Sequence, residues 1–251
     1  MIECKSLSAF YGAKCVLDEI SFSLKQGEFV AVVGKNACGK TTLLRSMIGM
    51  MKHIGGEVLV DEKPLRTLPQ NEVARRVSYL PQHTVTSSLS VFDTVLMGRL
   101  PHLSYPRIYR ECDREAAMRA IEAMQLTTLC NTSISELSGG YRQRVALASA
   151  LATESEYLLL DEPSTFLDME STLTFLTTLR TLARDGRGVL AVLHDLPLAL
   201  RFADRLLVLE NGHLIADDTP EMLFQNGTLE RTFGIRLGRV AIDRDILYYV
   251  G

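Results

Sequence analysis

The chain has 251 residues, of which 47% are hydrophobic and 23% are charged, the composition of an ordinary globular protein with a sizeable core. Its 27 basic and 30 acidic residues give a formal net charge of −3, so charge does not favour a phosphate backbone, and we expect no nucleic-acid partner. The five cysteines are scattered and free of any CxxC spacing, which favours free thiols in a reducing compartment over a disulfide framework.

Neither a secretory signal nor a membrane span is expected. The N-terminal stretch lacks the apolar run of a signal peptide, and no segment approaches the roughly 18 uninterrupted apolar residues of a spanning helix. We therefore expect one α/β domain, or one domain with an inserted lobe, which would serve a membrane only from outside it.

Four short apolar runs without alternation predict strands that are buried on both faces, as in a parallel sheet covered by helices. These runs lie at 29–33, 157–160, 189–193 and 206–209. Helical patterns lie between them, at 41–51 with 3.6-residue apolar spacing and at 141–152, which is rich in Ala and Leu. The predicted fold class is α/β.

Three further segments differ from this pattern. The first 60 residues predict short alternating strands with a turn at Gly55-Gly56. The stretch 91–130 has helical periodicity around a Pro-bounded loop at 100–106, and predicts a helical lobe inserted into the α/β core. The stretch 240–250 predicts a hairpin, with a packing role or a regulatory or dimer-supporting one.

The sharpest motif, GKNACGKT at 34–41, satisfies GxxxxGK[ST] between a predicted strand and a predicted helix, the context of a P-loop. Glycines let the backbone wrap around phosphates, and the helix N-terminus supplies free N–H groups and a positive dipole end. Lys40 would neutralise phosphate charge, and the Thr41 hydroxyl would ligate Mg²⁺. The predicted nucleotide-binding residues of this loop are Gly34, Lys35, Asn36, Ala37, Cys38, Gly39, Lys40, Thr41 and Thr42.

A P-loop alone leaves kinases, GTPases, helicases and transport ATPases open. Asp161 and Glu162 follow the apolar run 157–160, at the edge of the sheet where α/β proteins bind ligands. Asp161 would hold Mg²⁺ through water, and Glu162 would polarise an attacking water. By themselves, two acids after an apolar strand fit a solvated strand end equally well.

The segment LSGGYRQR at 137–144 narrows these classes, because it resembles the signature of ABC-transporter ATPases. The order of motifs is similar to that family over essentially the whole chain. The other matching positions are Tyr11, Gln82 in YLPQ, Asp161-Glu162-Pro163, STFLD at 164–168 and His194 in VLHD. The resemblance implies a single ABC ATPase domain over 1–251, with a P-loop (RecA-like) core and antiparallel β subdomain at 1–90 and 151–251. It also implies an inserted helical signature subdomain at about 91–150.

The same resemblance implies a role for each position. Tyr11 would stack on the adenine of ATP, although an ordinary aromatic at a strand end would look the same. Gln82 would complete the Mg²⁺ shell and sense the γ-phosphate, and His194 would contact that phosphate and position the water. The implied catalytic residues are Lys40, Gln82, Glu162 and His194, and the implied metal ligands are Thr41, Gln82 and Asp161.

The signature implies a dimer. Ser138, Gly139 and Gly140 precede a helix and would form a second anion-binding helix N-terminus. In the family this terminus faces the P-loop of the other subunit, so two ATP molecules would be sandwiched in a head-to-tail homodimer, with Asp168 in the loop between the sites. ATP binding would close the dimer, and hydrolysis would let it open.

The P-loop departs from the family pattern at three positions. Lys35 replaces Pro, and Ala37 replaces Gly, which would cost about 1–2 kcal/mol if this position needs a positive φ. Cys38 lies at the mouth of a helix N-terminus, which tends to lower a thiol pKa and raise its reactivity. We therefore expect alkylation or oxidation of Cys38 to block the phosphate site, with ATP protecting it, unless Cys38 is merely a small residue that fits.

The stretch VFDTVLMGRLPHL at 91–103 resembles a V-x-x-G-R-x-P element in ATPases of the iron-siderophore, haem and vitamin B12 import group. The resemblance implies metal-chelate import through separate integral-membrane permease subunits, indirectly served by a substrate-binding protein. The chain would lie peripherally at the cytoplasmic face of the inner membrane. Other small-molecule importers or exporters remain open. A soluble ABC ATPase of translation or DNA repair is disfavoured, since neither a second cassette nor a coiled-coil insertion is present.

Overall fold

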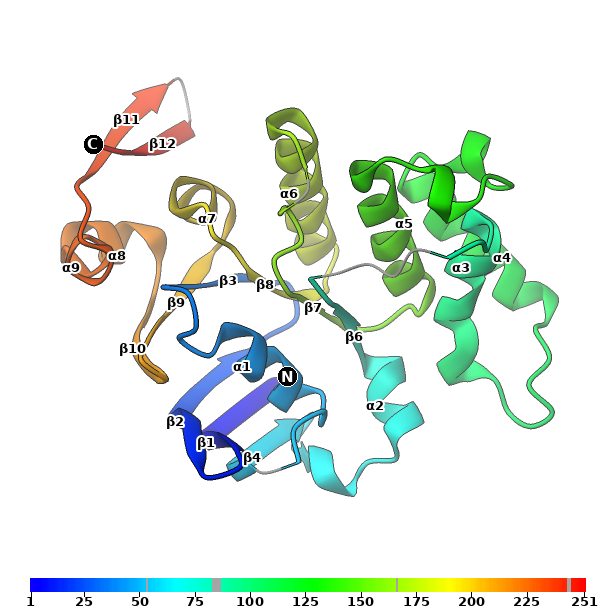
Figure 1. Ribbon diagram of the computed structural model, residues 1–251, viewed down its shortest axis with the longest axis horizontal. Helices are drawn as coiled ribbons and strands as arrows, with labels where there is room; N and C mark the ends of the chain where they lie inside the picture. The colour runs from blue at the N-terminus through cyan, green and yellow to red at the C-terminus, as the bar shows by residue number, and fades with distance from the viewer. Residues whose placement is uncertain (53, 83–86, 166, 243–244) are drawn as a thin grey trace.

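The computed structural model describes residues 1–52, 54–82, 87–165, 167–242 and 245–251, and Figure 1 shows their arrangement. A six-stranded sheet in the order β10-β9-β3-β8-β7-β6 forms its centre. All neighbours in it are parallel except β10, which pairs antiparallel with β9 at one edge. All four predicted buried strands are confirmed as members of this sheet. Its strands are β3 (Phe29–Gly34), β6 (Val77–Leu80), β7 (Tyr157–Leu160), β8 (Gly188–Val192), β9 (Arg205–Glu210) and β10 (His213–Asp218).

Helices cover one face of the central sheet, and a second sheet with the helices at 40–47 and 70–76 covers the other (Figure 1). The antiparallel sheet has the order β2-β1-β4-β5. Its strands are β1 (Ile2–Tyr11), β2 (Lys14–Leu24), β4 (Ile54–Val60) and β5 (Lys63–Pro64). The helices flanking the two sheets are α1 (Lys40–Met47), η1 (Leu65–Thr67), α2 (Gln70–Arg76), α6 (Met169–Arg184), α7 (Leu196–Phe202), α8 (Pro220–Gln225) and α9 (Thr228–Phe233).

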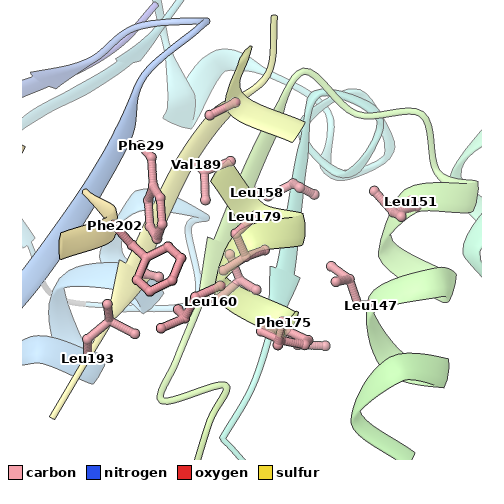
Figure 2. Close-up of a cluster of buried hydrophobic side chains, with 14 of the residues drawn as sticks. Phe29, Leu147, Leu151, Leu158, Leu160, Phe175, Leu179, Val189, Leu193 and Phe202 are labelled. Atoms are coloured by element: carbon pink, nitrogen blue, oxygen red, sulfur yellow. The ribbon is translucent and has the colours of Figure 1, made fainter. Parts of the chain in front are cut away.

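The side chains of the central strands alternate between two cores, because successive side chains of a strand point to opposite faces. Along β3, Phe29, Ala31 and Val33 join a helix-side core, whereas Val30 and Val32 join a sheet-side core that also contains residues of α1, β1 and β2. Figure 2 shows part of the helix-side core, in which side chains of the sheet meet Leu147 and Leu151 of α5 (Gly139–Ala152), Phe175 and Leu179 of α6, and Phe202 of α7. Burial on both faces explains why these strands are apolar throughout rather than alternating.

The segment between β6 and β7 is helical where it is described. Its elements are α3 (Val91–Leu96), the 3₁₀ turn η2 (Met97–His102), α4 (Glu111–Ala123), the 3₁₀ turns η3 (Thr127–Leu129) and η4 (Ile134–Glu136), and α5 (Gly139–Ala152). Pro101 lies inside η2, so the expected loop at 100–106 begins in a 3₁₀ turn. The apolar faces of α3, α4 and α5 pack into the helix-side core, which places this segment against one end of the central sheet.

The predicted turn at Gly55-Gly56 is wrong. Both glycines lie inside β4, at the shift in its pairing with β1 where Lys5 faces Glu57 and Ser8 faces Gly55. Gly56 has a φ of +70°, and a Cβ there would lie 2.1 Å from the backbone oxygen of Ser6. The dipeptide therefore marks a bulge with close backbone approach, which a local sequence pattern does not distinguish from a turn.

The predicted C-terminal hairpin is confirmed for the described residues. Its strands β11 (Leu237–Ile242) and β12 (Asp245–Val250) pair antiparallel. Tyr248 belongs to the helix-side core and packs edge-on against Phe224 of α8, with ring centroids 5.5 Å apart. These contacts give the hairpin a packing role.

Cys38 faces the interior rather than the phosphate-binding side of its loop. Its side chain belongs to the sheet-side core and is 5% exposed. Burial raises the pKa of the Cys38 thiol, and the nearby positive charge of Lys40 opposes this only in part. The expected lowering of this pKa is therefore wrong, because the neighbouring core removes the thiolate from water.

The G-R-x-P stretch folds back onto the end of α5. A Cβ at Gly98 would lie 2.1 Å from the backbone oxygen of Ser149, so only glycine permits this approach. Arg99 is 7% exposed, donates through Nε to Asp113 Oδ1 at 3.1 Å, and donates through Nη1 to the backbone oxygen of Ala152 at 2.8 Å. These contacts tie η2 to α4 and α5.

We expect Asp113→Asn to lower the free energy of unfolding by about 2 kcal/mol at pH 7, because it removes the buried carboxylate partner of Arg99 and leaves that charge paired only with the exposed Glu154. Burial alone would raise the pKa of Asp113, but hydrogen bonds from the Arg110 backbone and Arg99 outweigh it and hold that pKa below its ordinary value. A carboxylate with a depressed folded pKa stabilises the fold above its unfolded pKa, and this contribution is lost as the pH falls through the folded value. The difference between variant and wild type should therefore shrink below about pH 4.

Urea unfolding at pH 7 and at successively lower pH measures this difference. Glu111→Gln, an exposed change in the first turn of the same helix, is the control and should shift stability by less than about 0.5 kcal/mol. If Asp113→Asn changes stability no more than Glu111→Gln does, the buried ion pair does not hold this segment together.

We expect a maleimide to modify Cys38 roughly tenfold or more slowly than the exposed Cys15 and Cys112 in the folded protein, since it is buried and its thiolate is disfavoured. Mass spectrometry of peptides after timed quenching gives the three rates. Equal labelling of Cys38, slowed by ATP, would instead support a reactive thiol at the phosphate loop.

Candidate functional site

A cavity of about 680 Å³ opens at the carboxyl edge of the central parallel sheet. Each of four strands leads into one part of its wall: β3 into the phosphate loop, β6 into Gln82, β7 into Glu162 and β8 into His194. Parallel strands bring their carboxyl ends to one edge, which explains how residues far apart in sequence meet here. The cavity is lined by Val16, Asn36, Ala37, Gly39, Lys40, Thr41, Thr42, Gln82, Glu162 and His194.

The phosphate loop wraps over the N-terminus of α1. Gly39 precedes this helix with a φ of +106°, a conformation that an L side chain rarely adopts. Lys40 is buried, and its Nζ donates to the backbone oxygens of Gly34 at 2.8 Å and Lys35 at 3.0 Å. Its ammonium is thus held by the loop itself, beside the free N–H groups of the helix N-terminus. Loop, charge and helix terminus together form an anion cradle.

Ala37 has the positive φ that the sequence analysis considered for this loop position. Its φ is +62°, in the left-handed region. The conditional expectation of a positive φ is confirmed, and alanine there costs about 1–2 kcal/mol relative to an unstrained backbone. Lys35, which stands where the family pattern has Pro, is exposed at the start of the loop.

Asp161 lies directly after β7 and beside the start of α1. Its side chain accepts from the Thr41 hydroxyl at Oδ1, 3.1 Å away, and from the Tyr79 hydroxyl at Oδ2, 3.2 Å away. Asp161 is 1% exposed, and this burial raises the pKa of its carboxyl, although the bonds from Thr41 and Tyr79 oppose the shift. A hydroxyl and a buried carboxylate beside an anion cradle are oxygen donors of the kind that Mg²⁺ takes together with a phosphate.

Glu162 is the centre of a second polar group. Gln82 Nε2 donates to Glu162 Oε2, and His194 Nε2 lies 2.5 Å from Glu162 Oε1. The Glu162 backbone has a φ of +50°, and strained residues of this kind cluster at functional sites. The three side chains come from the ends of β6, β7 and β8, so the sheet brings them together. A carboxylate held by two donors at a cavity wall can accept a proton from a water.

The remaining predicted site residues lie outside this cavity lining. Tyr11 ends β1 and is 50% exposed. Ser138 is the exposed N-cap residue of α5, and Gly140 lies beside Leu167 and Ser171 at the start of α6. Asp168 caps α6 by accepting from the Ser171 backbone at 2.7 Å, a hydrogen bond that lowers the pKa of its carboxyl. The signature residues and Asp168 therefore lie together near the N-terminus of α6, outside the lining of the cavity.

Two residues of the site were missed from the sequence. Val16 lines the cavity from β2, where it is one of several alternating apolar residues without a distinguishing signal. Tyr79 bonds Asp161, and its position three residues before Gln82 was the only available hint. Both contacts depend on strands from different parts of the chain.

No helix among the described residues is long and apolar enough to cross a membrane. Residues 17–165 match the family described as ABC transporter. The chain is 36% identical to the probable siderophore transport system ATP-binding protein YusV of Bacillus subtilis (strain 168), over 93% of this chain and 86% of that protein. It is also 36% identical to the ferric enterobactin transport ATP-binding protein FepC of Escherichia coli (strain K12), over 92% of this chain and 86% of that protein.

Among solved structures, the chain is similar to an inward-facing metal-chelate type ABC transporter. The TM-score is 0.86 at 26% sequence identity, over 100% of this chain and 96% of that one. The family match covers more than half of the sequence, and the curated relatives match over most of both chains. The chain belongs to the ABC transporter family.

Proposed function

We propose that this chain is the ATP-hydrolysing subunit of an ABC importer, which dimerises around two ATP molecules and powers uptake through separate integral-membrane permease subunits. The observation that carries the proposal is the cavity, where an anion cradle, a buried carboxylate and a held glutamate converge within one chain. Phosphoryl transfer to water needs this set and little else, because it depends mostly on positioning and charge neutralisation.

In this proposal the phosphate loop binds the β- and γ-phosphates of ATP through its backbone N–H groups and Lys40. Thr41, Asp161 and Gln82 would hold Mg²⁺, which when bound neutralises developing charge on the phosphates. The bonds of Lys40 to two loop carbonyls hold its ammonium beside the cradle. Tyr11 is assigned to the adenine, and Val16 joins the wall of the nucleotide site.

Glu162 is assigned as the general base. A water attacks the γ-phosphorus in line with the bond to the β–γ bridging oxygen, and its proton passes to Glu162 as that bond breaks. Gln82 and His194 already hold the two Glu162 oxygens and would reorient towards the γ-phosphate and the water. Lys40, Gln82, Glu162 and His194 thus form the proposed catalytic set.

A homodimer would complete the site. Among the described residues, no part of the signature at 138–140 lines the cavity, and Ser138 offers an exposed helix N-terminus without a side-chain cap bond. A second copy placed head to tail would bring Ser138, Gly139 and Gly140 to the γ-phosphate in the first copy, with Asp168 near the joint. Gly140 lies beside Leu167 and Ser171, which flank Asp168 along the chain, and this arrangement supports a shared interface.

The helical segment is proposed as the subdomain that meets the permease. Met97, Leu100, Tyr105 and Ile108 are exposed there, with Tyr105 97% exposed. A groove of about 490 Å³ runs between this segment and β6. Because large exposed apolar groups mark interaction sites, this face suits an apolar element of a membrane protein. The chain would lie at the cytoplasmic face of the inner membrane.

The proposed cargo is an iron-siderophore or a related metal chelate, delivered to the permease by a substrate-binding protein. Support comes from the relatives named for siderophore and ferric enterobactin transport, and from the metal-chelate type structure. The Gly98 and Arg99 contacts explain why the G-R-x-P stretch has this sequence, because both residues make internal packing contacts of the helical segment. The exposed residues beside them would contact the permease.

We expect the wild type to hydrolyse ATP and Glu162→Gln to lose activity about a hundredfold or more, since the general base is removed while the shape is kept. The variant should also elute as a dimer in gel filtration only with ATP and Mg²⁺. Glu115→Gln, an exposed change on α4 away from the cavity and the start of α6, is the matched control and should behave as wild type. Equal turnover by Glu162→Gln and wild type would show that the catalytic assignment is wrong.

We expect source cells lacking this gene to lose energised uptake of at least one radiolabelled ferric siderophore, haem or corrinoid. A plasmid carrying the wild type should restore uptake, whereas Glu162→Gln, which retains the docking surface, should not. Normal uptake of all three classes in the deleted cells, with a purified ATPase that is active, would remove the chelate assignment and leave the motor assignment intact.

A further inference from the structure

Tyr79, whose own role the proposed reaction does not use, contacts the proposed metal ligand Asp161 through its hydroxyl. Tyr79 lies near the carboxyl end of β6 and donates to Asp161 Oδ2 at 3.2 Å. The other oxygen, Oδ1, accepts from Thr41 at 3.1 Å. Each carboxylate oxygen of a nearly fully buried Asp161 thus has its own hydroxyl donor, one from α1 and one from β6. Together these two bonds define the plane of the carboxylate.

A third residue lies beside the Tyr79 hydroxyl. Arg45, on α1, interacts with this hydroxyl, and the interaction raises the pKa of the Arg45 guanidinium. A guanidinium can only donate, so it does not compete for the single hydrogen of the Tyr79 hydroxyl, which is left for Asp161.

Packing alone does not account for the hydroxyl. The Tyr79 ring is half-buried against the sheet-side core, a contact that phenylalanine would also make. The oxygen adds one contact to a carboxylate that would otherwise have Oδ2 buried without another described hydrogen bond. Outer partners of this kind set the orientation of metal-ligating carboxylates in other sites.

We propose that Tyr79 is a positioning residue for the Mg²⁺ of the bound nucleotide, because its hydroxyl fixes the Asp161 carboxylate in the orientation that the metal requires. The inference rests on the proposed nucleotide site and deepens it. Tyr79 touches neither the nucleotide nor the reacting atoms in this proposal, and it acts only through Asp161.

Tyr79→Phe tests the proposal because it deletes one oxygen and keeps the ring. The affinity of a non-hydrolysable imido analogue of ATP is measured by calorimetry, once with Mg²⁺ and once in EDTA. The dissociation constant in EDTA divided by the dissociation constant with Mg²⁺ reports how much the metal strengthens binding. We expect this ratio to fall about tenfold in Tyr79→Phe, the size typical of a lost outer partner at a metal site, with the EDTA affinity within about twofold of wild type. In the ATPase assay, the Mg²⁺ concentration for half-maximal activity should rise by a similar factor.

Tyr157→Phe is the matched control. Tyr157 also belongs to the central sheet, and its hydroxyl lies 3.5 Å from Asp61 Oδ1, but it begins β7 whereas Asp161 follows the other end. This variant should leave both affinities within about twofold of wild type.

Three results would overturn the proposal: a metal ratio in Tyr79→Phe equal to wild type, an EDTA affinity that falls as much as the Mg²⁺ affinity, or the same loss in Tyr157→Phe. The last two would make the effect merely structural. If the wild type bound no analogue under either condition, the proposed nucleotide site would fail and take this inference with it. Tight wild-type binding with an unchanged Tyr79→Phe would remove the positioning role alone.

Discussion

The parallel pairing of the central strands is the constraint on which the rest of this molecule depends. Parallel neighbours cannot be joined by tight turns, so each strand returns through a crossover that covers a face of the sheet. Both faces are therefore buried, and most polar groups that the strands carry lie at their ends. β3, β6, β7 and β8 all end at the same edge, and each leads into one part of the cavity wall. The strand topology therefore determines where the site lies, and the side chains at the strand ends determine its chemistry.

The polar groups at this edge form hydrogen bonds and ion pairs with one another. Lys40 is bonded to loop carbonyls, Asp161 to two hydroxyls, and Glu162 to an amide and an imidazole. Buried or half-buried polar groups without partners would destabilise the fold, so this mutual pairing lets the cavity exist as a preformed structure. In the proposed reaction a nucleotide would replace several of these partners, which requires little rearrangement of the backbone.

The helical segment separates structural from interaction residues along a short stretch. Gly98 and Arg99 face inward. Because Gly98 has no side chain, η2 can approach α5 closely, and the buried Arg99–Asp113 ion pair holds η2 against α4. Their neighbours Met97 and Leu100 are exposed. Motif residues of this kind can be kept for internal packing, while the surface beside them is free to follow a partner. A resemblance in this motif therefore indicates the structure of the segment more than the identity of its binding partner.

The sequence by itself determined the buried strands, the phosphate loop and the beginning of α5, because these follow from local patterns: continuous apolar runs, glycine spacing and a helix start. It also indicated the strain at Ala37, where the backbone conformation belongs to the loop motif. Tertiary structure decided the rest. Gly56 lies in a bulge because β1 approaches it closely. The Cys38 thiol points into the protein because the sheet-side core surrounds it. Val16 and Tyr79 join the site because strands from distant parts of the chain carry them there. Burial and contact between remote segments set pKa values and hydrogen-bond partners, and no local pattern contains them.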